Sequence, residues 1–278
     1  MSKTISLGRI AFINVLPVYY ALEEGILSHP FNLVYGIPSA LNDKMKNGEL
    51  AVSSCSCMEY ARRWRNYYLA SDLCIASPGP VMSVLLLSQA PLTEADGHEI
   101  LISGQSHTSV VLTKLLLQER LGLKHVRFRT GQVRESLEAG EKPWAVLTIG
   151  DEALSLRKHP DYPIRTDLAC AWKEWTGLPF VFAVWIISRN AAQEGLFTGD
   201  PTKLIRQSRS WGLAHLEQCL SKLQGKTPLC QEELFYYYSQ ALCFSLGPKE
   251  CQGLQLFYEK SVKAGLLEEV PPLTFFPA

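Results

Sequence analysis

The sequence predicts an α/β fold of two lobes, with one lobe inserted into the other. Residues 5–65 alternate between short apolar runs and helical patterns, in the order β-α-β-α-β that is typical of a parallel sheet with right-handed crossovers. Residues 89–182 contain an alternating set of their own, whereas the chain after residue 200 contains only helical patterns. The length of 278 residues, 47% of them hydrophobic, is sufficient for two cores.

The first part of the chain is expected to form five strands and three helices. Pro17 in a first turn, Ser39 as an N-cap and Gly48 at a helix exit mark the helix ends. The turn Ser77-Pro78-Gly79-Pro80 joins the last two strands. The expected strands are 5–13, 31–37, 50–57, 67–76 and 81–88, and the expected helices are 16–25, 39–48 and 58–65.

The elements in the middle and at the end of the chain are predicted from the same patterns of apolar residues. Residues 106–122 have the strongest helical periodicity of apolar side chains. In the middle we expect strands 99–104, 126–130 and 144–149 and helices 106–122, 133–139 and 151–159. Amphipathic helices 201–223, 231–245 and 248–267 follow, before a Pro-rich tail.

This order predicts a discontinuous outer lobe, residues 1–88 plus 185–278, and an inner lobe, residues 89–184. The chain would cross between the lobes twice, near Ser88 and near Val184. Two crossing strands form a hinge, and a cleft between lobes is a favoured place for a ligand.

Asp167–Trp185 is the most distinctive stretch. An apolar strand over 180–187 follows the turn Thr176-Gly177-Leu178-Pro179. The tryptophans around this turn fit either of two interpretations, a loop that lines a closed site or a Trp-rich turn in the core.

The composition excludes several classes of function. Lys+Arg and Asp+Glu both total 27, so nothing favours nucleic acid or an anionic membrane as a partner. We expect no signal peptide and no membrane span, and we read the eight cysteines as free thiols of a cytoplasmic protein. Cys55 and Cys57 lack the CxxC spacing of redox and zinc motifs, so core packing is expected for both.

Polar residues follow several predicted strands at their carboxyl ends, where ligands bind in open parallel sheets. We expect Asn14, the Ser53 to Ser56 stretch, the turn 106–109 and Gly150-Asp151 to share one cleft edge. Each has a plain structural alternative: Asn14 as a turn residue, Ser106 as an N-cap, and Asp151 as a first-turn acid.

The turn Ser106-His107-Thr108-Ser109 has the clearest chemistry. Free N–H groups and the helix dipole favour a carboxylate or phosphate there, and the hydroxyls add donors. The dipole disfavours a charged His107, so we expect this residue to be positional and not a base. Ser83 lies in an apolar strand, where its hydroxyl needs a partner or a ligand.

We find no nucleotide-binding, metalloprotease or serine-hydrolase motif, and the six histidines show no metal spacing. We therefore expect no cofactor and no metal.

Several stretches together resemble the chorismate dehydratase family of the futalosine pathway of menaquinone biosynthesis. TGLPFVFAVW at 176–185 is the most specific of them. The others are GRIAFIN at 8–14 with Leu16-Pro17, SCMEYA at 56–61, GPVMSV at 79–84, SHTS at 106–109 and IGDEAL at 149–154. The resemblance covers roughly residues 8–185, and the C-terminal helices match only in type.

The resemblance implies a fold like that of type II periplasmic binding proteins, and the conversion of chorismate to 3-[(1-carboxyvinyl)oxy]benzoate plus water. It implies Asn14 and Ser83 as the catalytic polar residues. It also implies Ser106, Thr108 and Ser109 as the turn that holds a carboxylate. We further expect Ser56, His107, Asp151 and Gly177 to bind the substrate. This chain departs from the family at Ala51, where relatives commonly have Asp, and at Cys55 and Cys57 around Ser56.

Asn14 and Ser83 have no usable pKa near 7, so neither is a good general base. We therefore expect the protein to position the substrate, exclude water and stabilise charge, while the enolpyruvyl carboxylate of the substrate takes the proton. Two rival interpretations are the sister enzyme 1,4-dihydroxy-6-naphthoate synthase, with a histidine base, and a non-catalytic protein that binds a small anion.

Overall fold

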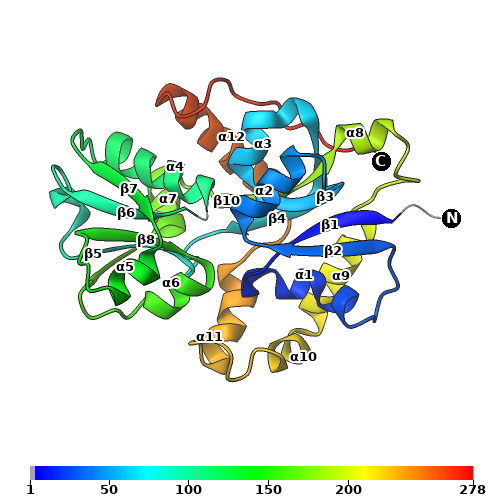
Figure 1. Ribbon diagram of the computed structural model, residues 1–278, viewed down its shortest axis with the longest axis horizontal. Helices are drawn as coiled ribbons and strands as arrows, with labels where there is room; N and C mark the ends of the chain where they lie inside the picture. Colours follow the sequence, from blue (N-terminus) through cyan, green and yellow to red (C-terminus); the bar gives the residue numbers. More distant parts are fainter. Residues whose placement is uncertain (1–3, 105, 278) are drawn as a thin grey trace.

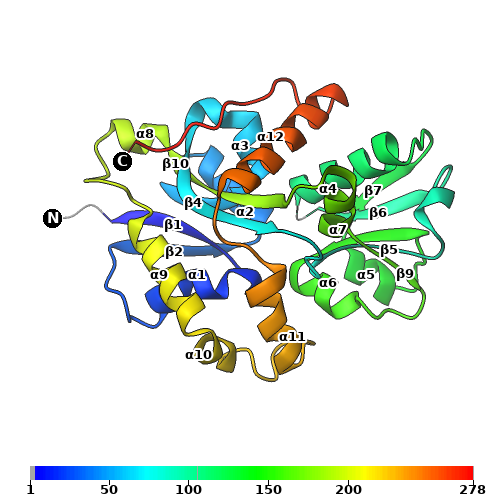
Figure 2. The same ribbon diagram turned by 180° about the vertical axis from the view of Figure 1, so that it is seen from behind.

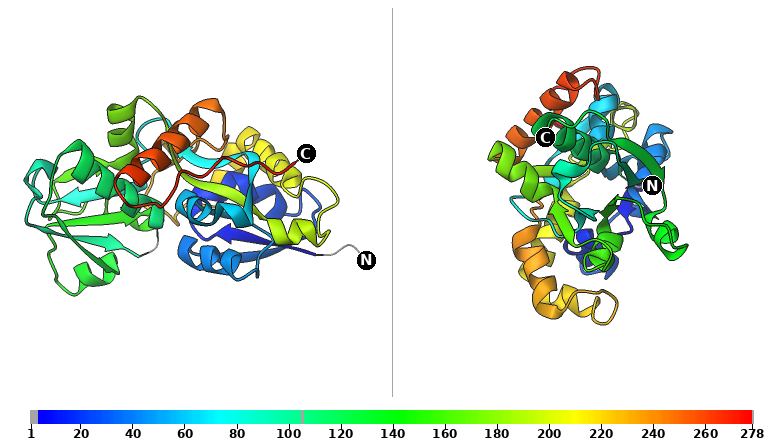
Figure 3. Two further views of the ribbon diagram at one scale, coloured as in Figure 1. Left: turned by 90° about the horizontal axis from the view of Figure 1, so that it is seen from above. Right: turned by 90° about the vertical axis from the view of Figure 1, so that its left-hand side faces the viewer.

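The computed structural model describes residues 4–104 and 106–277. It contains two five-stranded sheets, each covered by helices, which lie at opposite ends of an elongated molecule (Figures 1 and 3). We call the part built on the first sheet the outer lobe and the part built on the second sheet the inner lobe. The predicted two-lobed α/β architecture is confirmed.

The first sheet has the strand order β2-β1-β3-β10-β4. β1 pairs in parallel with both β2 and β3, whereas β10 is antiparallel to β3 and β4. The strands are β1 (Ile5–Ile10), β2 (Phe31–Gly36), β3 (Val52–Ser56), β4 (Tyr67–Ser77) and β10 (Phe180–Ser188).

The second sheet has the order β7-β6-β8-β5-β9. Its strands are β5 (Val84–Ser88), β6 (Glu99–Ser103), β7 (Arg127–Gly131), β8 (Ala145–Ile149) and β9 (Ile164–Asp167). The predicted division at Ser88 assigns β5 to the outer lobe, but β5 pairs with β8 and β9 of the inner lobe. β10 likewise belongs to the first sheet from Phe180 onward, before the predicted boundary at Val184. We therefore infer that the chain crosses between Ser77 and Val84 and again between Asp167 and Phe180.

Helices cover both sheets (Figures 1 and 2). In the outer lobe, α1 packs against α9, with Gly212 at the crossing: a Cβ atom there would lie 2.1 Å from the Pro17 carbonyl oxygen. The longer helices are α1 (Leu16–Glu23), α2 (Pro38–Lys46), α4 (His107–Leu115), α7 (Leu168–Thr176), α9 (Lys203–Ala214) and α12 (Pro248–Lys263). The shorter helices are α3 (Cys57–Arg63), α5 (Val133–Glu138), α6 (Gly150–Leu156), α8 (Arg189–Gln193), α10 (Leu216–Ser221) and α11 (Gln231–Tyr236). One-turn segments are η1 (Ile13–Val15), η2 (Trp64–Asn66), η3 (Leu92–Glu94), η4 (Leu116–Arg120) and η5 (Tyr237–Ala241).

Some element ends differ from the prediction. The first strand stops at Ile10, and Asn14 lies in the single turn η1. Ser39 is not an N-cap, because Pro38 already occupies the first turn of α2 and Ile37 is the cap. The predicted helix 201–223 is divided into α9 and α10 at His215.

The stretch Asp167–Trp185 forms the helix α7 and the first part of β10, and its tryptophans do not line the cavity described below. Asp167 caps the helix α7 by accepting the Ala169 and Cys170 N–H groups at 3.1 Å. Trp172 is fully buried and packs edge-to-face on Phe180. The core interpretation is therefore correct for Trp172 and Trp185, whereas Phe182 and Ala183 of the same stretch line the cavity.

The cysteines are free thiols, as predicted. Cys55 and Cys57 are fully buried, and burial raises the pKa of the Cys57 thiol to about 12. Both therefore act as small core residues, and the nearby departure at Ala51 is also buried. Among the described residues, no helix combines the length and the apolar character that crossing a membrane requires.

Candidate active site

A cavity with ≈ 530 Å³ of empty space, part of it open to solvent, is lined by residues of both lobes. Five polar residues that the sequence analysis singled out line it together: Asn14, Ser56, Ser83, Ser106 and Ser109. The segment before β5 and the strand β10 contribute apolar wall residues, among them Val81 and Phe182.

Asn14 enters the cavity from the turn η1, directly after β1. Its Oδ1 atom is buried and has no hydrogen-bond partner among the described residues. A buried polar atom without a partner carries a desolvation penalty of about 1–3 kcal/mol. An orphaned acceptor in a cavity wall is therefore well suited to a ligand that supplies a donor.

Ser83 lies immediately before β5, one residue outside the strand in which the sequence placed it, and is almost fully buried. Its Oγ accepts a hydrogen bond from the hydroxyl of Tyr237 at 2.8 Å, and its own contact to the Val81 carbonyl is long, at 3.4 Å. Met82, immediately before it, has a left-handed φ of 64°, and its N–H donates to Asp167 at 2.7 Å. Asp167 therefore fixes the turn that presents Ser83.

Ser106 is the N-cap of α4 and accepts the Ser109 N–H at 3.3 Å. The Ser106 hydroxyl also donates to Ser109 Oγ at 3.2 Å, which leaves the Ser109 proton available. The N–H groups of His107 and Thr108 have no partner among the described residues. The capping interpretation of Ser106 is confirmed, and the end of the helix still presents free donors.

Ser56 caps α3 and accepts hydrogen bonds from the Glu59 N–H at 3.2 Å and from Asn42 Nδ2 at 3.4 Å. Its oxygen is therefore occupied by the protein. Ser56 remains part of the wall, with only its own proton available for a ligand.

The other predicted site residues do not line the cavity. His107 is exposed and contacts Arg62 at 3.3 Å; partial desolvation and the Arg62 charge lower the pKa of its imidazole. Thr108 Oγ1 accepts the Met58 N–H, and Asp151 Oδ1 accepts the Ile13 N–H. Gly177 is an exposed residue that ends α7 with a φ of 75°, a conformation that favours glycine.

Gly150 does line the cavity, beside Asp151. Its φ is 58°, and a Cβ atom there would lie 2.9 Å from the ring of Phe12. Its N–H donates to the Ser83 carbonyl at 2.7 Å. A side chain at this position would displace the turn that carries Asn14.

None of the described side chains that line the cavity is ionisable. Hydroxyls and one amide are its polar groups, so this wall can bind a ligand, orient it and stabilise charge but offers no general base.

Tyr237, whose hydroxyl donates to Ser83 in the cavity wall, was not predicted from the sequence. The run of three tyrosines at 236–238 gives no signal for it, because which ring is buried depends on the tertiary packing.

Comparisons with known proteins agree with this picture. A family model described as menaquinone biosynthesis matches residues 5–263. A chorismate dehydratase of Thermus thermophilus is 29% identical over 273 residues, covering 91% of this chain and 93% of the relative. A chorismate dehydratase of Campylobacter jejuni is 32% identical over 264 residues, covering 92% and 97%.

Solved structures show the same fold at low identity. A protein of Archaeoglobus fulgidus has a TM-score of 0.76 at 18% identity, covering 96% of this chain and 99% of that chain. The periplasmic aliphatic sulphonate binding protein of Escherichia coli has a TM-score of 0.68 at 12% identity, covering 100% and 94%. The predicted likeness to periplasmic binding proteins is therefore confirmed for the fold. Because the family model spans nearly the whole sequence, the chain belongs to the menaquinone biosynthesis family that its motifs predicted.

Proposed function

We propose that this protein is a chorismate dehydratase, which converts chorismate to 3-[(1-carboxyvinyl)oxy]benzoate and water. The observation that supports the proposal most directly is the cavity between the two lobes, because none of its described polar side chains can ionise. The two relatives that match most of this chain are named chorismate dehydratases. Such a wall suits a substrate that brings its own base. We place the reaction in the cytoplasm, with no cofactor and no metal.

Chorismate carries two carboxylates, and the open end of α4 is the natural place for one of them. The unpartnered N–H groups of His107 and Thr108, the Ser109 hydroxyl and the positive end of the helix dipole all favour a negative charge there. The α4 helix has no acidic residue in its first turn that would oppose this charge.

The reaction removes the C4 hydroxyl and the C3 proton, and the ring becomes aromatic. With no ionisable side chain in the described wall, the enolpyruvyl carboxylate of the substrate takes the C3 proton. Asn14 orients this carboxylate or the leaving hydroxyl, and Ser83 forms a hydrogen bond in the same region. The wall excludes water and stabilises the charge that develops.

The test is to incubate the purified protein with chorismate, follow its loss by absorbance and identify the product by mass spectrometry. We expect dehydration in the wild type and a loss of about 100-fold or more in kcat for Asn14→Ala. Asn32→Ala, an exposed amide on β2, is the matched control and should keep wild-type turnover.

Two outcomes would contradict the proposal. Chorismate that binds but stays unchanged would indicate a binding protein, and turnover of a cyclic dehypoxanthine futalosine instead would indicate the naphthoate synthase. Wild-type turnover by Asn14→Ala would remove Asn14 from the mechanism.

A further inference from the structure

Two adjacent tyrosines at the start of the π-helical turn η5 lie behind the cavity. Tyr237 and Tyr238 are buried, and their rings pack against each other at a centroid distance of 5.1 Å. Single π-helical turns are rare and occur frequently at functional sites. Their hydroxyls point to two different places, and each place is next to one of the two proposed catalytic residues.

Tyr237 reaches the first of these places. Its hydroxyl donates to Ser83 Oγ at 2.8 Å. Burial raises the pKa of Tyr237, so the phenol remains a protonated donor throughout the neutral range. Because Ser83 accepts from Tyr237 and its own donor contact to the Val81 carbonyl is long, the Ser83 proton is available for the substrate.

Tyr238 reaches the second place. Its hydroxyl donates to the carbonyl oxygen of Ile13 at 2.6 Å, and Asp151 from the inner lobe accepts the Ile13 N–H at 3.2 Å. The Ile13 carbonyl belongs to the peptide that carries Asn14. Since Oδ1 of Asn14 has no partner among the described residues, the direction of this side chain depends on that peptide plane.

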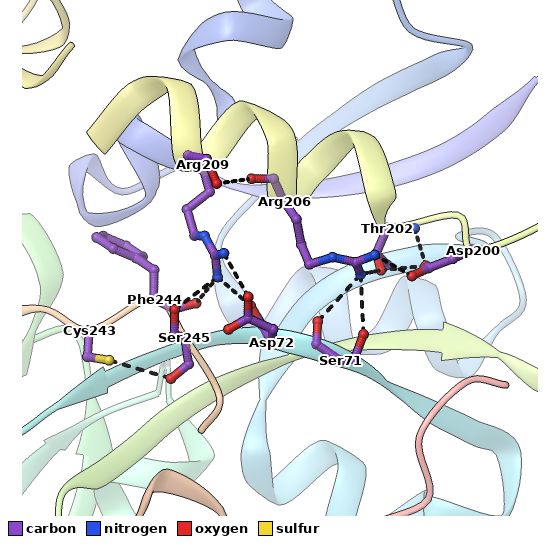
Figure 4. A network of polar contacts seen from close by, with 10 residues as sticks. Ser71, Asp72, Asp200, Thr202, Arg206, Arg209, Cys243, Phe244 and Ser245 are labelled. Carbon is purple, nitrogen blue, oxygen red and sulfur yellow. Dashed lines mark hydrogen bonds and ion pairs between the residues drawn. The ribbon is translucent and has the colours of Figure 1, made fainter. Parts of the chain in front are cut away.

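The segment that follows the π-helical turn η5 is fixed by hydrogen bonds. The next residues form hydrogen bonds with β4: Cys243 N–H to the Ala76 carbonyl at 2.8 Å, and Cys74 N–H to the Phe244 carbonyl at 3.1 Å. Arg209, on α9, bonds to the Phe244 carbonyl and to Ser245 Oγ, both at 3.2 Å, and pairs with Asp72 (Figure 4). The tyrosines are therefore mounted on a segment that several independent contacts fix to the first sheet.

We propose that Tyr237 and Tyr238 are positioning residues, which act through Ser83 and through the Ile13–Asn14 peptide respectively. The expected effect on kcat rests on the proposed function. The expected effect on the orientation of Ser83 and Asn14 rests only on the two hydrogen bonds. One short segment from the C-terminal part of the chain would thus fix the orientation of both Ser83 and Asn14.

The experiment removes one hydroxyl at a time. Tyr237→Phe and Tyr238→Phe are each expected to lower kcat on chorismate about 10-fold and to change KM less than about twofold, because orientation at the reacting atoms affects the chemical step more than binding. Tyr162→Phe is the matched control. Its buried ring also carries a hydroxyl that donates to a backbone carbonyl, that of Pro143 at 3.0 Å, and neither residue lines the cavity.

Double variants separate positioning from a general loss of stability. If Tyr237 acts through Ser83, Tyr237→Phe should have no further effect on kcat in a Ser83→Ala background. By the same reasoning, Tyr238→Phe should have no further effect in an Asn14→Ala background. Each tyrosine change should remain fully effective in the other background. Independent effects in the matched pairs, or wild-type kcat in both single variants, would overturn the proposal.

Crystal structures of the two Phe variants provide a readout that requires no turnover. We expect a changed Ser83 rotamer in Tyr237→Phe and a rotated Ile13–Asn14 peptide in Tyr238→Phe. If the wild type does not dehydrate chorismate, the proposed function fails and these structures still decide the positioning role. Side chains of Ser83 and Asn14 that superimpose on the wild type in both variants would then overturn it.

Discussion

Two helices begin at the cavity from opposite lobes, and both are capped by a serine. Ser56 caps α3 on the outer lobe, and Ser106 caps α4 on the inner lobe. At α3 the donors are used by the protein itself: Ser56 accepts the Glu59 N–H, and Thr108 accepts the Met58 N–H. The first turn of α3 also contains the buried carboxylate of Glu59. At α4 there is no first-turn acid, and two N–H groups have no partner among the described residues.

The difference shows that a serine cap does not by itself indicate an anion site. What decides is whether the remaining donors are occupied and whether a negative charge is already present. By this criterion we propose that α4 is the end that receives a substrate carboxylate and that α3 is a structural support. The predictions below test this assignment.

The largest effect is expected when a negative charge is placed at the open end. Ser106→Asp keeps a good N-cap, so the stability of α4 should change little. The new carboxylate repels the substrate, and kcat/KM should fall about 100-fold or more, since opposing like charges cost several kcal/mol. Ser188→Asp, at the cap of α8, makes the same change away from the cavity and should leave kcat/KM unchanged.

Thr108 should be a support of α3 and not a substrate contact. Thr108→Val removes the acceptor of the buried Met58 N–H, so the free energy of unfolding should fall by about 1–3 kcal/mol. KM should stay close to that of the wild type, because the Thr108 N–H is retained. Urea unfolding and steady-state kinetics measure the two quantities, and a large rise in KM at unchanged stability would reverse the assignment.

Two of the serines that line the cavity, Ser109 and Ser56, should respond differently. Ser109→Ala removes a free donor at α4 and should raise KM about 10-fold, in line with the strength of a hydrogen bond to a charged group. Ser56→Ala removes a cap and should lower the free energy of unfolding by about 1 kcal/mol, with only a minor change in KM. If the two variants behaved alike, the comparison between α3 and α4 would be wrong.

The smallest effect is expected from the acid in α3. Burial raises the pKa of Glu59 above its ordinary value of 4.5, although Arg63 opposes the shift. A raised acid pKa means that the folded state binds the proton more tightly, so ionisation destabilises the fold as pH rises from about 4.5 through the folded pKa. The stability of the wild type relative to Glu59→Gln should therefore decrease as the pH rises from 4 to 7.

Chemical unfolding at several pH values measures this difference, and the exposed Glu135→Gln is the control. A wild type that gains stability relative to Glu59→Gln over the same range would show that the ion pair with Arg63 outweighs burial.

Much of the fold could be predicted from local pattern. The alternation of apolar runs and helical periods is a local property, and it identified nine of the strands in β1 to β10. The ninth strand in the chain, β9, was missed because Ile164–Asp167 is short and half-exposed, without a periodic signal. β5 was assigned to the wrong sheet because strand partners are chosen by tertiary packing.

The candidate site divides in the same way. The sequence by itself determined which residue types follow the strands, and Asn14, Ser56, Ser83, Ser106 and Ser109 do line one cavity. It also determined the turns, because Gly150 and Gly177 adopt the positive φ that glycine favours. Only the tertiary structure decided which donors stay free, that Thr108 and Asp151 are used by the protein, and that Tyr237 and Tyr238 lie behind the site. The physical reason is that hydrogen-bond partners separated by up to 225 positions in sequence are brought together only by packing, which no local pattern records.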